Sequence, residues 1–188
     1  MTVVIQTSYN HLSEVIISMK QTGSFDDYLV SPISRIELFF SLLISSLFVC
    51  LIVGIINIFA LSFFNNFHNI NFISSFIYLS ITIIIFSSLG AVTGFLSFTW
   101  DIQSSISNFF IVPISFLSGT FFSIKTINPD WQFLFKYNPF YYLVNGFRSS
   151  FIIDFKINFF SQLYILVILF IVLIISIYIF NKGYKVIT

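Results

Sequence analysis

The residues of this chain that could take part in chemistry are few and far apart. His11 and His68 stand on either side of a long apolar stretch, and Cys50 is the only cysteine, so no Cys–His metal spacing or intrachain disulfide exists. No glycine-rich phosphate loop is present. Asp101 stands beside Trp100 at the end of an apolar stretch, so no buried carboxylate points to a proton-coupled carrier. The sequence therefore predicts no catalytic residue, no metal and no cofactor.

One short acidic and aromatic segment is the best candidate for a binding element. Residues 24–30 read Ser-Phe-Asp-Asp-Tyr-Leu-Val, between Gly23 and Pro32. Ser24 is predicted as an N-cap, and two carboxylates in the first turn favour the positive end of the helix dipole. Aromatic side chains on a short rigid helix make good anchors in a pocket of a partner; the alternative is a packed interfacial turn without a partner. The residues expected to bind are Phe25, Asp26, Asp27, Tyr28, Leu29, Ser31 and Pro32.

Helix start and stop signals frame this segment. Residues 10–20 have the pattern of a short amphipathic helix, which Gly23 would end. Ser34 and Glu37 have the spacing of a capping box, in which each side chain accepts from the other residue's amide. We therefore interpret Glu37 as a helix cap rather than as a proton carrier.

Four long apolar stretches make up most of the remaining chain, over residues 38–64, 72–98, 106–122 and 163–180. About 20 apolar residues are needed for a helix to cross a hydrocarbon core of about 30 Å. Only 8% of the residues are charged and the mean hydropathy is +1.00, so surplus apolar surface must face lipid. We expect an all-α, polytopic transmembrane bundle with four full spans, embedded in a lipid bilayer.

Glycines mark the faces on which the predicted spans are expected to pack. Gly54 lies on a face of small residues in the first span, and Gly90 and Gly94 form a GxxxG pattern in the second. Residues without bulky side chains let two helices approach closely. A path for a polar cargo is the alternative, but small residues are routine at helix contacts in membranes. Pro113 is expected to bend the third span.

An aromatic and polar segment separates the third stretch from the fourth. Asn128 and Asn138 are each followed by proline, a pair that suits a helix start with Asn as N-cap and Pro at the first helical position. Two short helices fit here, and a full span does not. We predict an interfacial helical hairpin over residues 128–151, with Arg148 reaching water, a lipid phosphate or a backbone carbonyl. Its marker residues are Trp131, Asn138, Pro139 and Arg148.

Charge does not orient the chain. Four spans place both termini on one side of the membrane, and the basic residues divide equally between the two sides, a tie under the positive-inside rule. The net charge of +1 gives no reason to expect nucleic acid as a partner.

Two segments resemble a known family. The run over residues 23–34, Gly-Ser-Phe-Asp-Asp-Tyr-Leu-Val-Ser-Pro-Ile-Ser, resembles the cytoplasmic coupling segment of type-2 ATP-binding-cassette (ABC-2 type) permeases. The run Phe-Leu-Ser-Gly-Thr-Phe-Phe at 116–122, together with Trp131 and residues 138–148, resembles the final loop of the same family. The two matches stand in the family's order, with two predicted spans between them and one after, and the resemblance covers nearly the whole chain.

The resemblance implies a single ABC-2 type transmembrane domain over residues 1–188. Such a chain is not an enzyme. It is the permease subunit of an exporter in the bacterial cytoplasmic (inner) membrane, and it pairs with a separate ATPase subunit, which binds the ATP, and with a second permease subunit in a homodimer or heterodimer. The resemblance also places residues 24–32 in the cytoplasm and residues 128–151 outside.

The resemblance leaves two questions open. The family has six spans, so relative to it the first span and most of the second are missing; residues 1–10 resemble the tail of that second span, and we expect an N-terminally truncated permease. Relatives handle drugs, lipids and polysaccharides, and nothing in this sequence selects among them. The alternative function is a non-transporting membrane scaffold or assembly protein. A secondary carrier is disfavoured because buried charges and inverted repeats are not evident.

Overall fold

The computed structural model describes residues 1–63, 71–120, 138–151 and 159–182, with the isolated residues 128, 132 and 135; the side chains of Asp26, Leu29, Leu61 and Phe159 are not described. Its regular elements are all helices within these residues. In chain order they are α1 (Thr2–Thr22), α2 (Ser24–Val30), α3 (Arg35–Ser62), α4 (Phe72–Leu96), α5 (Trp100–Ile106), the π-helix η1 (Ser107–Ile111), α6 (Val112–Leu117), α8 (Pro139–Ser149) and α9 (Phe159–Lys182).

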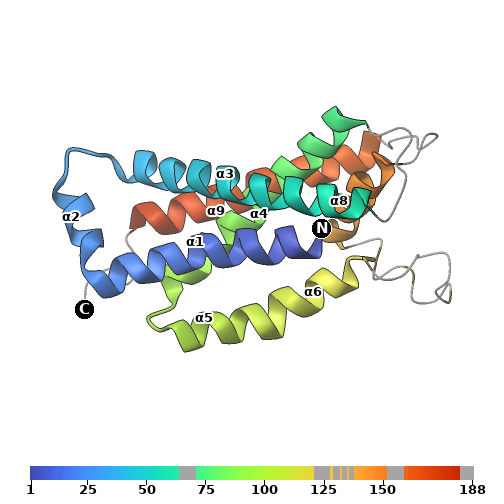
Figure 1. Cartoon of the computed structure of the whole chain (residues 1–188). Coiled ribbons are helices and arrows are strands. Elements are labelled where there is room, and N and C mark those ends of the chain that lie inside the picture. The colour runs from blue at the N-terminus through green and yellow to red at the C-terminus, as the bar shows by residue number, and fades with distance from the viewer. Residues whose placement is uncertain are drawn as a thin grey trace.

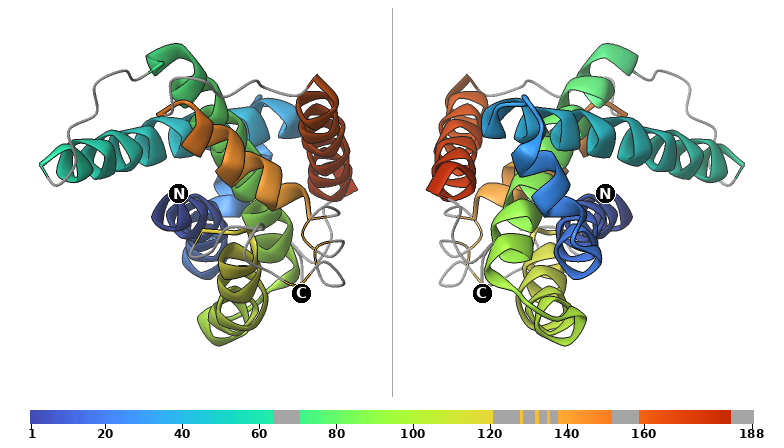
Figure 2. Two further views of the ribbon diagram at one scale, coloured as in Figure 1. Left: turned by 90° about the vertical axis from the view of Figure 1, so that its right-hand side faces the viewer. Right: turned by 90° about the vertical axis from the view of Figure 1, so that its left-hand side faces the viewer.

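The helices form one bundle with two different ends (Figure 1). Helix α4 lies in the centre with α3 and α9 on either side of it, and α1 and the α5–α6 segment cover another side (Figure 2). Helix α2 lies across one end, which we call the α2 end. Helix α8 lies at the other, which we call the α8 end. Helices α3 and α9 meet at the α2 end, where Arg35 Nη1 donates to the carbonyl oxygen of Asn181 at 2.7 Å.

Three helices of the described chain are long and apolar enough to cross a membrane, namely Arg35–Ala60 in α3, Phe72–Leu96 in α4 and Phe160–Lys182 in α9. They correspond to the first, second and fourth predicted stretches. The prediction of four full spans is therefore confirmed only in part.

The third stretch has a different form from the one predicted. Its helix begins earlier, at Trp100, and is divided into α5, η1 and α6. Pro113 has no amide proton to donate to the carbonyl four residues earlier, and the π-helix lies directly before it. Where the sequence predicted a bend, the structure has a π-helical turn followed by a new helical segment that contains Pro113.

Helix α1 corrects the prediction of a short amphipathic helix over residues 10–20. It is one helix from Thr2 to Thr22, and among the helices that the structure describes its contact with α4 is the most extensive. Its inner face is buried along nearly its whole length, from Val4 to Ile17. The helix ends at Gly23, whose φ of 75° is a conformation that glycine adopts without strain, and whose N–H donates to the Lys20 carbonyl.

Two glycines of α4 lie directly on the backbone of α1. A Cβ atom at Gly90 would overlap the carbonyl oxygen of Tyr9, and one at Gly94 would lie 3.0 Å from the Cα of Ser13. At Gly54 of α3 an added Cβ would meet only side-chain atoms of Leu79 and Val4, at 3.6 and 3.7 Å. The close approach expected of the GxxxG pattern is therefore made with α1 of the same chain, and Gly54 has ordinary packing.

Buried hydroxyl groups connect the helices at mid-bundle. Ser46 Oγ on α3 donates to Ser87 Oγ on α4 at 2.9 Å, and Ser87 Oγ donates to the carbonyl oxygen of Ser8 on α1 at 3.2 Å. On the other side of α4, Ser176 Oγ of α9 donates to the carbonyl oxygen of Ser88 at 3.0 Å. These bonds fix α4 against α1, α3 and α9 in an interior where an unpaired polar group would be costly.

Candidate coupling site at the α2 end

Helix α2 follows α1 after a single residue. Ser24 is its first helical residue and Gly23 occupies the N-cap position, so the prediction of Ser24 as N-cap is wrong. The Ser24 hydroxyl instead lies 2.7 Å from the Thr22 hydroxyl. At the other end, Ser31 closes the helix, since its amide donates to the Asp27 carbonyl at 3.2 Å and its hydroxyl to the Tyr28 carbonyl at 2.7 Å. The helix bounds predicted by Gly23 and Pro32 are correct.

The inner side of α2 is held by the ring of Phe25, which is only 4% exposed. This ring meets Phe95 of α4 edge to face, with centroids 5.8 Å apart, and Phe180 of α9 at 6.2 Å. Phe180 also packs on Phe39 of α3 at 5.4 Å. The expectation that Phe25 inserts into a partner is therefore corrected, because its ring is already buried in an aromatic cluster of its own chain, formed by Phe25, Phe39, Phe95 and Phe180.

The outer side of α2 is accessible. Val30 is 88% exposed and Tyr28 is 38% exposed, and Asp27 and Pro32 are exposed as well. Ser31 is half-buried. The side chains of Asp26 and Leu29, two further residues of the predicted binding set, lie outside the described part of the structure. Helix α2 thus has a buried anchor on one side and an apolar and acidic surface on the other.

Lys20, for which the local sequence pattern indicates no particular role, has a structural role at this end. Its Nζ donates to three carbonyl oxygens at the end of α4, those of Gly94 at 3.0 Å, Phe95 at 2.5 Å and Ser97 at 3.3 Å. The last carbonyls of a helix lack helical hydrogen-bond donors and carry the negative end of the helix dipole. An ammonium group donates hydrogen bonds to these carbonyls and offsets their partial negative charge. The same Nζ lies 5.4 Å from the centroid of the Phe95 ring. Lys20 therefore fastens the end of α1 to the end of α4.

The start of α3 is fixed by the predicted capping box. The Ser34 amide donates to Glu37 Oε2 at 2.8 Å, and the Glu37 amide donates to Ser34 Oγ at 3.3 Å. This confirms Glu37 as a helix cap. Together with the bond from Arg35 to the Asn181 carbonyl, the box fixes the chain on the far side of α2.

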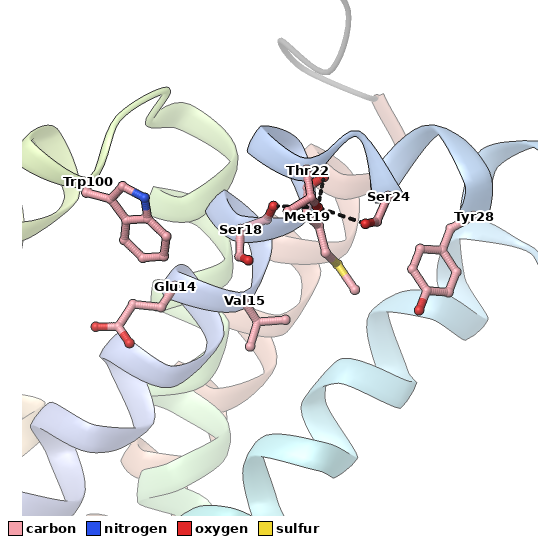
Figure 3. Close-up of a pocket in the computed structure, with 8 residues that line it drawn as sticks. All are labelled: Glu14, Val15, Ser18, Met19, Thr22, Ser24, Tyr28 and Trp100. Atoms are coloured by element: carbon pink, nitrogen blue, oxygen red, sulfur yellow. Dashed lines mark hydrogen bonds between the residues drawn. The ribbon is translucent and has the colours of Figure 1, made fainter.

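A groove opens between α1, α2 and the start of α5 (Figure 3). Its volume is about 510 Å³. Trp100 closes one side, and its indole Nε1 donates to Gln21 Oε1 of α1 at 2.6 Å. Tyr28 of α2 lies on the other side in Figure 3. The residues around the groove are Glu14, Val15, Ser18, Met19, Thr22, Ser24, Tyr28 and Trp100.

Comparison of the sequence with known proteins identifies its family. The family described as ABC-2 type transporter matches residues 1–152. The chain belongs to the ABC-2 type transporter family. It is 28% identical over 153 residues to the inner membrane transport permease YadH of Escherichia coli strain K12, and equally to the proteins of that name from E. coli O157:H7 and Shigella flexneri.

Each alignment with these relatives covers 79% of this chain and 58% of the relative, so the ABC-2 chain spans less than two thirds of their length. No solved structure gives a significant match.

A polar contact joins the α5 segment of this ABC-2 chain to α1. Gln103 Nε2 donates to Ser13 Oγ at 2.9 Å and to Asn10 Oδ1 at 3.2 Å, and Ser107 Oγ donates to the same Asn10 oxygen at 3.0 Å. Gln103 and Ser107 are buried. The sequence did not predict this contact, because Asn10 and Ser13 lie about 90 residues away from Gln103 and Ser107 in the chain. The only signal in the sequence was that polar residues occur in both apolar segments.

At the α8 end, the second half of the predicted hairpin is present as α8. Asn138 Oδ1 accepts from the Phe140 amide at 3.0 Å, with Pro139 at the first helical position, as predicted. Arg148 Nη2 donates to the carbonyl oxygens of Gly119 at 2.8 Å and Thr120 at 3.3 Å, which is one of the three partners expected for it. Trp131 and most of the predicted first short helix lie outside the described residues.

Among the residues that the structure describes, no group of three or more His, Cys, Asp or Glu side chains is placed to hold a metal ion. At the α2 end, a surface helix packs through Phe25 against two of the candidate membrane spans, α4 and α9.

Proposed function

We propose that this chain forms the transmembrane domain of a permease subunit in an ATP-driven exporter. The family match and the three helices of membrane-spanning length support a multi-pass protein. The matched relatives are named inner membrane transport permeases, which supports a location in the bacterial cytoplasmic membrane. The permease itself holds no cofactor. ATP is bound and hydrolysed in a separate ATPase subunit, and the cargo is drug-like, a lipid or a polysaccharide.

The two-sided arrangement of α2 carries this proposal. The outward residues Tyr28 and Val30 form the contact with the ATPase, and the α2 end faces the cytoplasm, with the α8 end outside. When the ATPase dimer closes on ATP, it displaces α2. Because Phe25 is packed between Phe95 and Phe180, this displacement passes directly to α4 and α9.

A second path runs through α1. Lys20 connects the end of α1 to the last carbonyls of α4, and Gln103 connects α1 to the α5 segment. A displacement of α2 therefore also displaces α1, to which Gly23 joins it, and through α1 it displaces α4 and α5. Several helices respond as one unit, which is what reorientation of a transport path between two sides of a membrane requires.

A second permease subunit completes the proposed transporter, in a homodimer or a heterodimer. The surface of η1 is strongly apolar and open, with Phe109 77% exposed and Phe110 62% exposed. A surface of this kind is covered either by lipid or by another membrane helix.

Co-purification with the ATPase tests the proposal. The permease, purified from its host membrane, is expected to bring with it an ATPase that carries a Walker motif. In proteoliposomes the pair is expected to hydrolyse ATP faster with one of a panel of drug-like, lipid or polysaccharide cargos than without. A permease that binds no ATPase contradicts the proposal and favours the alternative of a membrane scaffold or assembly protein.

A further inference from the structure

Another groove opens between α4 and α9, near the α8 end of the bundle. Its volume is about 250 Å³. Tyr78 of α4 and Ile165 of α9 line it and are buried, whereas Ile77 and Leu166 are 49% and 46% exposed. Both helices are candidate membrane spans, and the exposed side chains are apolar. The groove therefore has a buried floor and opens onto a surface that faces lipid.

Side-chain contacts join α4 to α9 at two other levels of the bundle. Phe95 meets Phe180 at the α2 end, and Ser176 Oγ donates to the Ser88 carbonyl at mid-bundle. Towards the α8 end, at residues 74–81 and 162–166, the groove lies between the two helices. Apolar side chains around a hollow lose dispersion contacts unless other atoms fill it. The hydrocarbon region of a bilayer holds no water, so a hydrocarbon chain is the filling that the membrane supplies.

The groove changes from polar to apolar along its length. Ser74 and Gln162 each lie in the first turn of a candidate span, at the level where the hydrocarbon core begins. Within the described part of the chain, neither the Ser74 hydroxyl nor the Gln162 amide forms a hydrogen bond. The lining further along α4 is apolar as far as Ile81, about 10 Å from Ser74 at the rise of a helix, and one leaflet of the core is about 15 Å deep. An amphipathic molecule that lies along the helices has the same order of polarity.

We propose that this groove binds one phospholipid from the leaflet at the α8 end. An acyl chain lies along Ile77, Ile81 and Leu166, and the ester carbonyls accept hydrogen bonds from the Gln162 amide and the Ser74 hydroxyl. A volume of about 250 Å³ over a length of about 10 Å corresponds to a cross-section of about 25 Å². A single hydrocarbon chain enters a channel of this width. A helix of a second subunit, with a diameter of about 10–12 Å, does not.

The bound lipid completes the packing of three helices at this end. Its acyl chain rests on the ring of Tyr78, and the other side of that ring lies against Gly146 of α8, where an added Cβ would overlap it. The lipid therefore joins α4 to α9 and supports the contact between α4 and α8. Removal of the lipid is expected to loosen the α8 end and to leave the aromatic cluster at the α2 end unchanged.

Two leucines of α9 provide a matched pair of variants. Leu166 lines the groove and is 46% exposed, whereas Leu163 lies outside its lining and is 49% exposed. Native mass spectrometry counts the phosphatidylethanolamine molecules that the full-length permease retains from mixed micelles. Wild type and Leu163→Trp are expected to retain one more phospholipid per chain than Leu166→Trp, whose indole fills the groove. Equal retention by the two variants overturns the proposal. If Leu166→Trp instead lowers the fraction of dimer with unchanged lipid retention, a second copy of the chain covers the groove and the proposal is wrong.

A variant at the polar end of the groove does not depend on how a larger side chain is tolerated. Gln162 is exposed, and Gln162→Leu keeps a side chain of similar size without the amide. Added phosphatidylethanolamine is expected to raise the melting temperature of the detergent-solubilised wild type, because a ligand that binds only the folded state stabilises it. Gln162→Leu is expected to weaken the phospholipid affinity about two- to tenfold, the effect of one lost hydrogen bond. General lipid contact predicts the opposite, since leucine is more apolar than glutamine. An affinity equal to or tighter than that of wild type overturns the proposal.

Discussion

The ring of Phe25 on α2 meets the ring of Phe95 on α4 at an interplanar angle of 82°, with the two centroids 5.8 Å apart. Phe95 in turn meets Phe180 of α9 at 4.5 Å and 85°. Edge-to-face pairs of this kind contribute about 0.5–1.5 kcal/mol each beyond the area they bury. Helix α2 is therefore attached to two of the candidate membrane spans by rings, and it cannot shift without moving them or breaking the contact.

Removing the Phe25 ring should loosen this attachment. Phe25→Ala is expected to lower the free energy of unfolding by about 3–5 kcal/mol, because it leaves a cavity among buried aromatic side chains. Thermal unfolding of the purified permease measures the effect. Val30→Ala is the matched control, since Val30 lies on the opposite side of α2, is 88% exposed and should change stability by less than about 0.5 kcal/mol. Equal melting temperatures for wild type and Phe25→Ala would show that the aromatic cluster does not hold α2.

The glycines of the bundle should differ sharply in their tolerance of a methyl group. Gly90→Ala is expected to destabilise the bundle by about 1–3 kcal/mol, because the new Cβ meets the backbone of Tyr9 and the two helices must separate. Gly54→Ala is expected to be nearly neutral, since its Cβ meets only flexible side chains at ordinary distances. Thermal unfolding of the two variants side by side provides the measurement. Equal losses would place the close contact of α4 somewhere other than α1.

Loss of the Lys20 ammonium should fray the last turn of α4. Lys20→Met keeps the apolar stem but leaves the carbonyls of Gly94, Phe95 and Ser97 without this donor, at a cost of about 1.5–3 kcal/mol. Hydrogen exchange at the Ser97 amide, which donates to the Thr93 carbonyl, should become faster. Lys20→Arg keeps the charge and should restore part of the protection. Unchanged exchange in Lys20→Met would mean that the carbonyls do not depend on Lys20.

Local patterns in the sequence predicted the elements whose causes are local. Length and hydropathy were sufficient for α3, α4 and α9. The cap at Asn138 and the box at Ser34 and Glu37 depend on neighbours a few residues away. Helix α1 was predicted only over residues 10–20, as an amphipathic helix. Two of its polar side chains, Asn10 and Ser13, instead bind Gln103 of α5 and Ser107 of η1.

The burial of the Phe25 ring also could not be predicted from the residues near it in the sequence. The chain has 28 phenylalanines, and nothing in the sequence around any one of them tells a ring buried in the bundle from a ring facing lipid or a partner. The burial of Phe25 depends on Phe95 and Phe180, which only the folded chain brings to the α2 end.

The orientation proposed for the chain can be tested on whole cells. Single cysteines at Asp130 and Lys136, two positions outside the described residues, are introduced after Cys50→Ala has removed the native thiol. Both are expected to react with an impermeant thiol reagent added outside, because the segment before α8 is proposed to be external. A cysteine at Ser31 beside α2 should react only after the membrane is opened. The opposite pattern would reverse the orientation and remove the basis for an ATPase at the α2 end.

The affinity of the ATPase for a permease with an altered α2 surface tests the central proposal most directly. Val30 is 88% exposed, so Val30→Asp should leave the fold intact while placing a charge where the partner is proposed to bury an apolar contact. With the full-length permease in nanodiscs, Val30→Asp combined with Tyr28→Ala is expected to weaken ATPase binding at least about tenfold, the size of a hot-spot loss, with an unchanged melting temperature. Binding as tight as that of wild type would contradict a coupling role for α2.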